Sequence, residues 1–344
     1  MIPRVLAACA ALLLSVPALP AQSIFKSDVP LEVTLSANFR DLTRERDSTK
    51  LQWFGAEMTY KDDEGNTQTV AVELRARGHF RRQAANCSFP PMFVRVRGRE
   101  NREGTLLQGN PRLKLVTPCR PNLAEYQQYI YSEYLTNRTY AIIDPIHSRT
   151  RLASITYVDS TGRSKPVTVT AFFLETQEEV ADQAKLTYKE RTGVTWEYIP
   201  SDVIDRISLF QYWIANTDWS TAGLHNIFML EISDLEYRPV AYDFDWSGLV
   251  NTRYSRPNAT LGLTSTRQRL HRGPCRTAEQ WAPTIAYFQS KRAAVDSLWT
   301  TPLEGMDPRR QADGKKYLDQ LWPIVEDPRR FKREIIDQCQ REGN

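Results

Sequence analysis

The sequence predicts an α+β protein with a β-rich first part and a mainly helical second part. Two observations support this fold class. From Leu31 to Val116, apolar and polar residues mostly alternate, as in the run VAVELR at 70–75, and this period is typical of half-buried strands. From Asn122 onward the apolar residues recur every three or four positions instead, which indicates helices.

The β-rich part is expected to form an antiparallel sheet, with a turn at 62–66. Its strands are predicted in five runs: LEVTLSA, LQWFGAEMTYKD, TVAVELRARG, MFVRVRG and RLKLV. A helix is predicted over 122–143, and Asp144-Pro145 ends it because a proline disfavours helical geometry in the residue before it. Two more strands are predicted at 151–158 and 167–174.

The second part begins with a helix that Ser201 can cap and that ends near 216–218. A hairpin is predicted from strands 225–232 and 238–246. Three helical segments complete the chain, at 277–298, 309–325 and 328–341. Because repeats and long linkers are lacking, we expect one domain with two lobes, 22–175 and 176–344, the helix at 122–143 belonging to the first.

Residues 1–21 are predicted to be a cleaved signal peptide. Arg4 precedes an apolar run that is broken by Pro17 and Pro20 before it reaches the length of a membrane span, and small residues end at Ala21. Cys9 is expected to lie in the removed segment. The protein is therefore predicted to be exported to the periplasm or secreted, with no transmembrane segment.

Charge and cysteine content restrict the partners and the compartment. The formal net charge is +4 for 344 residues, and it falls to +3 when Arg4 is removed, so general attraction to nucleic acid is not expected. The four cysteines after the signal peptide favour two disulfides in an exported chain. Three pairings are open, and we predict Cys87 with Cys119 and Cys275 with Cys339, because each bridge then stays within one half.

Four polar residues form the most informative pattern. Asp218 follows a helix end in NTDWSTAGLHN, Asn226 opens a strand, and Asp243 and Asp245 lie in YDFDWSG at 242–248. If the hairpin turns near Leu235, Asn226 pairs with about Phe244, and the two aspartates share one face.

Carboxylate and carboxamide oxygens suit Mg²⁺ or Mn²⁺ held together with substrate phosphates. An Asp in a loop, then an Asn, then a hairpin ending in Asp-Phe is the order in which kinases orient a hydroxyl and hold metal. The alternative is that these residues only cap a helix and end a strand. The spacing of eight positions from Asp218 to Asn226 exceeds the usual five, so the loop must bulge.

The chain resembles the spore-coat CotH kinase-like family, an atypical branch of the protein-kinase-like fold. The resemblance covers about 70–255 and rests on three blocks: VELRARGHFRR followed by LKLV, SEYLTNRTY leading to AFFLE, and NTDW, HN and YDFDWSG. It implies a two-lobed kinase-like fold. It also implies that Asp218 is the catalytic Asp, Asn226 and Asp243 are metal ligands, and Asp245 is a second acidic group near the metal.

Kinase chemistry also requires a strand lysine paired with a helix glutamate, and Lys114 with Glu133 is the predicted pair. A solvated lysine and a surface glutamate are the alternative. No glycine-rich loop is present, so Arg77 and Arg81 are predicted to contact nucleotide phosphates, or else to form an exposed hairpin tip. Glu175 is predicted either to contact the nucleotide or to cap a helix.

One further group of cations could hold an acidic or phosphorylated substrate, or be solvated. It consists of Arg267, Arg269, Arg272 and Arg276.

The leading functional hypothesis is an exported kinase that transfers the γ-phosphoryl group of ATP to a protein Ser/Thr hydroxyl with Mg²⁺ or Mn²⁺. Its partner would be a protein substrate at the cell envelope or outside. The alternatives are a catalytically inactive, kinase-shaped binding protein at the surface or envelope, and a metal-dependent phosphoesterase.

Overall fold

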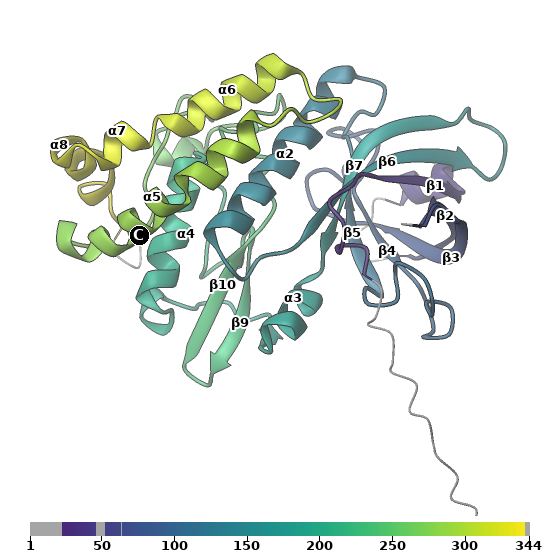
Figure 1. The fold of residues 1–344 in the computed structure, drawn as a ribbon, viewed down its shortest axis with the longest axis horizontal. Helices are drawn as coiled ribbons and strands as arrows, with labels where there is room; N and C mark the ends of the chain where they lie inside the picture. Colours follow the sequence, from purple (N-terminus) through teal and green to yellow (C-terminus); the bar gives the residue numbers. More distant parts are fainter. Residues whose placement is uncertain (1–22, 46–51, 63, 341–344) are drawn as a thin grey trace, which may run out of the picture.

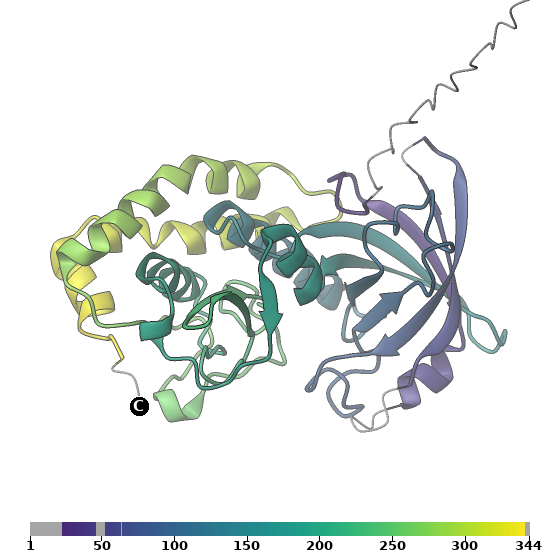
Figure 2. The same ribbon diagram turned by 90° about the horizontal axis from the view of Figure 1, so that it is seen from below.

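Seven strands of the first part close into a β-barrel in a computed structural model that describes residues 23–45, 52–62 and 64–340 (Figures 1 and 2). Around the barrel the strand order is β1-β2-β3-β4-β5-β7-β6. The bounds are β1 Leu31–Ala37, β2 Phe54–Lys61, β3 Thr67–Ala76, β4 Met92–Arg95, β5 Arg112–Val116, β6 Thr150–Asp159 and β7 Val167–Glu175, with helix α1 at Phe39–Arg44 between β1 and β2.

The prediction of a two-lobed protein-kinase-like fold is wrong, because the first part is a closed, mixed barrel and not an antiparallel sheet. Strand β1 pairs antiparallel with β2 and parallel with β6, where Leu31 lies opposite Ala153. All seven strands coincide with predicted runs. Alternation shows which residues of a strand face the core, but it does not show which distant strand pairs with it. The pairing of β1 with β6, which closes the barrel, therefore could not be predicted.

The barrel interior is filled by the apolar set of the alternating strands. Side chains that are completely buried come from most of the strands: Leu35, Met58, Leu74, Met92, Leu115, Ala171 and Phe173. Each large apolar side chain of this kind stabilises the fold by about 1.5–3 kcal/mol relative to exposure. The polar set therefore faces outward, and part of it faces the helical part.

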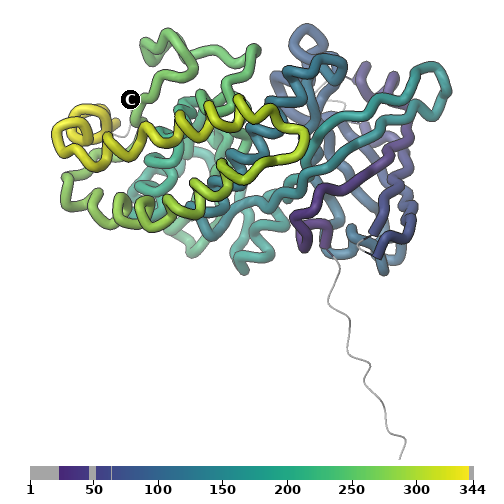
Figure 3. Tube along the Cα trace, turned by 45° about the horizontal axis from the view of Figure 1, so that its top comes forward, coloured from purple at the N-terminus to yellow at the C-terminus, as the bar shows by residue number. Residues whose placement is uncertain are grey.

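Helix α2, Ala124–Ile143, lies between β5 and β6 in the sequence but packs in the core of the helical part. Helix α5, Ala278–Thr300, packs against α2 and against helix α6, Pro308–Asp319, and α6 also contacts α2 (Figures 1 and 3). The predicted stop is confirmed, since the helix ends at Asp144.

The other elements follow in chain order. They are α3 Gln177–Ala184, β8 Thr187–Lys189, a 3-10 turn Trp196–Tyr198, α4 Ser201–Trp213, β9 Ile227–Ser233, β10 Glu236–Ala241, a 3-10 turn Ala259–Leu261, α5 Ala278–Thr300, α6 Pro308–Asp319, α7 Trp322–Val325, α8 Pro328–Phe331 and a π turn Lys332–Ile336. Strands β10, β9 and β8 form a small antiparallel sheet in that order.

Two disulfides confirm the predicted pairing, Cys87 with Cys119 and Cys275 with Cys339. The first joins the loop after β3 to the segment before α2. Disulfides of this kind are typical of proteins that fold in an oxidising compartment and fit an exported protein. Among the described residues, no helix is both long and apolar enough to cross a membrane. The predicted signal peptide, 1–21, lies outside the described residues.

Replacing both cysteines of the first bridge, Cys87→Ser with Cys119→Ser, should lower the free energy of unfolding by about 2–4 kcal/mol, because the bridge restricts the unfolded chain. Urea denaturation of the purified protein measures the change. As a control, Ala85→Ser in the same exposed loop should alter the stability by less than about 0.5 kcal/mol. A double variant that unfolds at the wild-type urea concentration would contradict the expectation.

Candidate functional site

Arg81, in the loop after β3, lies at the centre of a buried cluster of charges. Its Nη1 is 3.7 Å from Oε2 of Glu133 in α2. Its Nη2 is 3.2 Å from Oδ1 of Asp243, and its Nε is 3.4 Å from Oδ2 of Asp245, both in the segment after β10. One guanidinium thus joins the barrel, α2 and the acidic segment. The alternative of an exposed hairpin tip is excluded for Arg81, which is 6% exposed.

The cluster contains more carboxylates than Arg81 can neutralise. Burial raises the pKa of Glu133 and of Asp245 above the usual range, although Arg81 opposes both shifts. Burial alone would also raise the pKa of Asp243, but Arg81 and Arg77 outweigh it and lower that pKa. Asp243 is therefore the carboxylate that stays ionised, and 26% of its side chain is exposed.

The acidic segment leaves the hairpin earlier than predicted. Ala241 pairs with Ile227, and the Tyr242 N–H donates to the Asn226 carbonyl at 3.1 Å, so Asn226 lies opposite Tyr242 and not Phe244. Strand β10 ends at Ala241, and Asp243 adopts a φ of 60°, so strict strand alternation does not hold there. Both aspartates nevertheless face Arg81.

Phe244 anchors the segment between the two aspartates. Its side chain is completely buried, with its ring centre 5.6 Å from that of Tyr140 and 5.5 Å from that of Phe210. Tyr254 donates a hydrogen bond to Asp245 Oδ2 at 2.9 Å. Tyr254 is a site residue that the sequence analysis missed, because no motif links it to Asp245.

Asp218 and Asn226 come together after α4. The Asn226 Nδ2 donates to the backbone carbonyl of Asp218 at 2.7 Å and to its Oδ2 at 3.0 Å. His225 Nε2 is 2.8 Å from Asp218 Oδ1, and this contact raises the pKa of His225. The extra residues between the two form the expected bulge, which two backbone hydrogen bonds between Ser220 and His225 close at 2.9 and 3.0 Å.

Lys114 does not form the predicted pair with Glu133. Its side chain, which is 1% exposed, has no hydrogen-bond partner for Nζ among the described residues. The Nζ atom lies 4.7 Å from the ring centre of Tyr242. Burial lowers the pKa of Lys114 to about 7. Glu133 pairs instead with Arg81, which lies in the loop after β3. The path of that loop could not be predicted from the sequence.

Arg77 is a second, partly buried cation beside the acidic segment. Its Nε atom also lacks a hydrogen-bond partner within the described chain. Burial lowers the pKa of Arg77, while the nearby Asp243 partly restores it. The structure thus brings two cations with unused donors next to Asp243.

Glu175 is held by other protein groups. It is completely buried at the end of β7, where its carboxylate accepts from the Arg149 backbone N–H at 2.8 Å and from Arg149 Nε at 2.9 Å. Gln183 donates to the same carboxylate. These partners give Glu175 a structural role at the end of the barrel.

The four later arginines are also occupied by the protein itself. Arg267 pairs with Asp313, Arg269 donates to Tyr317 and Gln320, Arg272 donates to Thr217 and Trp219, and Arg276 pairs with Asp205.

Arg272 is a positioning residue whose role the sequence analysis did not identify. Its Nη1 donates to the carbonyls on either side of Asp218, at 2.5 Å to Thr217 and 3.0 Å to Trp219. In the sequence, Arg272 stands out only as one of four closely spaced arginines.

Two of the predicted oxygen ligands, those of Asn226 and Asp243, suit a Mg²⁺ ion, and the third, Asp245, does not. Asn226 uses its amino group on Asp218, so its carbonyl oxygen is not needed for that contact, and Asn226 lies opposite Tyr242, the neighbour of Asp243 in the chain. Asp245 is engaged by Arg81 and Tyr254. In the described ranges no three His, Cys, Asp or Glu residues are grouped to hold a metal. An ion here would complete its coordination with water and ligand phosphates, as Mg²⁺ usually does.

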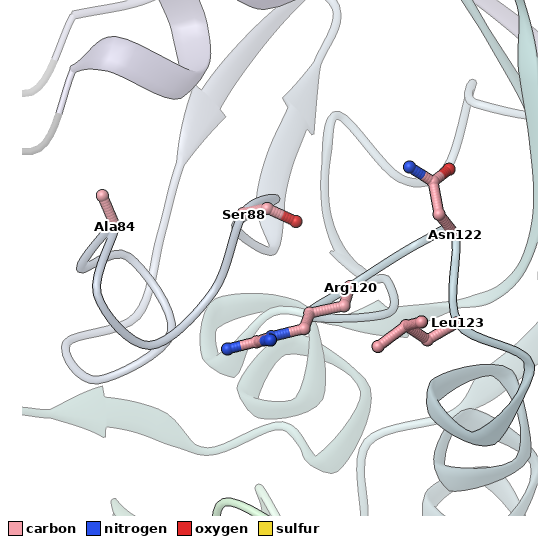
Figure 4. Close-up of a pocket in the computed structure, with 5 residues that line it drawn as sticks. All are labelled: Ala84, Ser88, Arg120, Asn122 and Leu123. Carbon is pink, nitrogen blue, oxygen red and sulfur yellow. The ribbon is translucent and has the colours of Figure 1, made fainter.

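A shallow pocket of about 400 Å³ lies beside the first disulfide and apart from these carboxylates. Ala84 and Ser88 line it from the loop after β3, while Arg120, Asn122 and Leu123 line it from the segment before α2 (Figure 4). None of these residues belongs to the predicted site, and Arg120 is its one charged lining residue.

No protein-family model matches the chain, and a search of curated proteins found no match. The resemblance to CotH kinase-like proteins stays a prediction from the quoted motifs.

Replacing Arg81 by Gln should lower the free energy of unfolding by about 3–5 kcal/mol, because the buried Glu133 and Asp245 and the partly exposed Asp243 would lose this cation. Without Arg81 the folded-state pKa values of all three acids rise, and those of Glu133 and Asp245, which burial already raises, move further above their unfolded values. The loss should therefore grow as the pH rises from 5 to 8. Denaturant unfolding at both pH values tests this, with Arg163→Gln in the exposed β6–β7 turn as the matched control. A loss that is equal at both pH values would contradict it.

Replacing Lys114 by Met should stabilise the protein. The lysine has a pKa of about 7 in the fold and about 10.5 when unfolded, so folding releases its proton between these values. Wild-type stability therefore gains up to about 1.4 kcal/mol per pH unit from pH 7 to 10, and Lys114→Met should lack this gain. Parallel slopes for the two proteins would show that Lys114 does not titrate in this range.

Proposed function

We propose that the protein is an exported phosphotransferase that moves the γ-phosphoryl group of ATP to a Ser/Thr hydroxyl of a protein substrate, with Mg²⁺ or Mn²⁺. The observation that supports it is the juxtaposition of Asp218, Asn226 and Asp243 with two cations, the buried Lys114 and the partly buried Arg77. Lys114 Nζ and Arg77 Nε have no hydrogen-bond partner among the described residues. The support comes from this site and not from the fold, since one fold hosts many functions.

Asp218 is proposed to accept the proton of the substrate hydroxyl. Its side chain is 36% exposed, which makes it accessible to a substrate. Asn226 and His225 hold its carboxylate, and Arg272 fixes the backbone on both sides of it. An oriented base of this kind places the hydroxyl oxygen for attack on phosphorus.

Asp243 and the Asn226 carbonyl oxygen are proposed to hold the metal ion. The bound ion would neutralise the charge of the triphosphate during transfer. Asp245 is a further acidic group in the cluster.

Lys114 and Arg77 are proposed to bind phosphate oxygens. Each presents a buried nitrogen without a hydrogen-bond partner in the part of the chain that the structure describes, and an unsatisfied buried donor costs about 1–3 kcal/mol. A phosphate group would satisfy these donors and would restore the charge that burial disfavours. Arginine and lysine are the usual residues for this task.

The two disulfides and the predicted signal peptide support an exported protein, so the substrate is proposed to lie at the cell envelope or outside. A binding protein without catalysis is the second candidate. It is favoured by the contacts of Arg81 with both Asp243 and Asp245, which give these carboxylates a structural partner.

The test is transfer of label from γ-labelled ATP to an acidic protein acceptor with Mg²⁺ or Mn²⁺. Asp243→Asn should lower the rate by about 10²–10³, the usual effect of losing one electrostatic group at such a centre. Asp218→Asn should lower transfer similarly while the thermal shift caused by ATP and metal persists. Asp313→Asn, which removes an exposed pair with Arg267, is the control and should keep full activity.

Three outcomes would replace the proposal. If ATP and metal raise the melting temperature but no acceptor becomes labelled, the protein would be a binding protein without catalysis. Release of phosphate from model esters without ATP would indicate a phosphoesterase. Equal labelling by wild type and Asp243→Asn would show that the reaction uses other residues.

A further inference from the structure

An arginine-rich surface covers the outer face of β3, β4 and β5, beside the candidate site. It consists of Trp53, Arg75, Phe93, Arg95, Arg97 and Arg112. Two rows of paired residues build it. Arg75 lies opposite Phe93, which lies opposite Lys114, and Glu73 lies opposite Arg95, which lies opposite Arg112. Because alternate residues of a strand share a face, both rows point away from the barrel interior, although Lys114 at the end of the first row is covered and only 1% exposed.

The cations of this surface rest on aromatic rings. The Arg95 guanidinium carbon is 3.7 Å from the ring centre of Trp53. That of Arg75 lies between two rings, 4.7 Å from Trp53 and 5.1 Å from Phe93. Rings below a guanidinium hold its plane in place and leave its edge free to bind.

The surface carries more positive than negative charge. Glu73 pairs with Arg95 at 2.6 Å and with Arg97 at 2.8 Å, and Glu178 pairs with Arg112. Arg75 has no carboxylate partner among the described residues, and its Nε is buried without a hydrogen bond. Burial and repulsion from Arg112 and Arg95 lower the pKa of Arg75. Arg75 thus has donor capacity that an anionic ligand would use.

The row Arg75, Phe93 and Lys114 leads from this surface to the candidate site. Neighbouring strands are about 4.8 Å apart, so the row covers about 10 Å. The row ends at Lys114, which is 1% exposed and packs on Tyr242, so a ligand lying over Arg75 and Phe93 would stop about one strand spacing from the candidate site.

We propose that this arginine-rich surface binds an acidic or phosphorylated polypeptide segment next to the acceptor hydroxyl. The role as acceptor site rests on the proposed function, whereas binding itself does not. Two glutamates, Glu73 and Glu178, lie among the arginines and would repel a continuous nucleic-acid backbone, but a peptide can place its carboxylates or phosphates between them. The low net charge of the whole chain, +4, also disfavours nucleic acid.

The test is a binding titration by fluorescence anisotropy without ATP, so that a failure of catalysis does not affect it. The probe is a short labelled peptide with one serine among aspartates and glutamates, and a second copy carries phosphoserine. Arg75→Gln should weaken binding of either peptide about fivefold to tenfold, which corresponds to roughly 1–1.4 kcal/mol. Arg163→Gln, an exposed arginine in the β6–β7 turn, should bind as the wild type does.

A second variant covers the possibility that Arg75→Gln disturbs the barrel. The side chain of Arg97 is 71% exposed, so Arg97→Gln should leave the melting temperature unchanged and still weaken binding a few-fold. Inorganic phosphate should compete with the phosphopeptide only weakly, because it lacks the carboxylates. Equal affinity of wild type and both variants, or tighter binding of a single-stranded oligonucleotide than of the peptides, would overturn the proposal.

Loss of peptide binding in Arg75→Gln with normal ATP use on a non-acidic acceptor would place the defect at this surface. Normal peptide binding with no phosphoryl transfer would instead contradict the proposed function alone. The two proposals can therefore fail separately.

Discussion

The contacts of Arg81 with three carboxylates hold the two parts of the molecule in one arrangement. Glu133 comes from α2, and Asp243 and Asp245 come from the segment after β10, so a single side chain from a barrel loop bridges both. A buried charge is costly unless it is paired, so the barrel cannot move away from the helical part without exposing three acids or leaving them unpaired. The relative position of Lys114, Asp243 and Asn226 depends on this contact.

Several weaker restraints support the loop that carries Arg81. The disulfide from Cys87 to Cys119 ties it to the segment before α2, and the Phe80 ring packs on Trp246 with ring centres 5.2 Å apart. A covalent bond and an aromatic contact thus both restrain the loop that carries Arg81. The unused donors of Lys114 and Arg77 have the opposite effect, because they cost stability in the free protein. A site that keeps such groups is typical of a binding or catalytic function.

Much of the local structure could be predicted from the sequence. The seven barrel strands, the end of the long helix at Asp144 and both disulfides agree with their patterns, because each depends on residues close in the chain or on few alternatives. The closing pair of β1 with β6 and the partner of Glu133 could not be predicted, since both depend on distant segments. In the site, Asp218 and Asn226 were found together, whereas Tyr254 was missed because it belongs to no motif. Arg272 was noted only as a possible substrate-binding cation, and its contact with the backbone around Asp218 was not foreseen. The early end of β10 was missed as well, because the turn at Asp243 lies inside an alternating run.

The position of α2 in the chain has a consequence for how the molecule can be divided. This helix is bounded in sequence by barrel strands β5 and β6, yet its apolar residues, such as Ile130 and Leu135, lie in the core of the helical part. A cut after Glu175 would therefore leave the barrel with an uncovered apolar helix and would remove a central helix from the remainder. Neither fragment would be a self-sufficient folding unit. The barrel and the helical part are interleaved along one polypeptide, so either they reach the native state together or neither does.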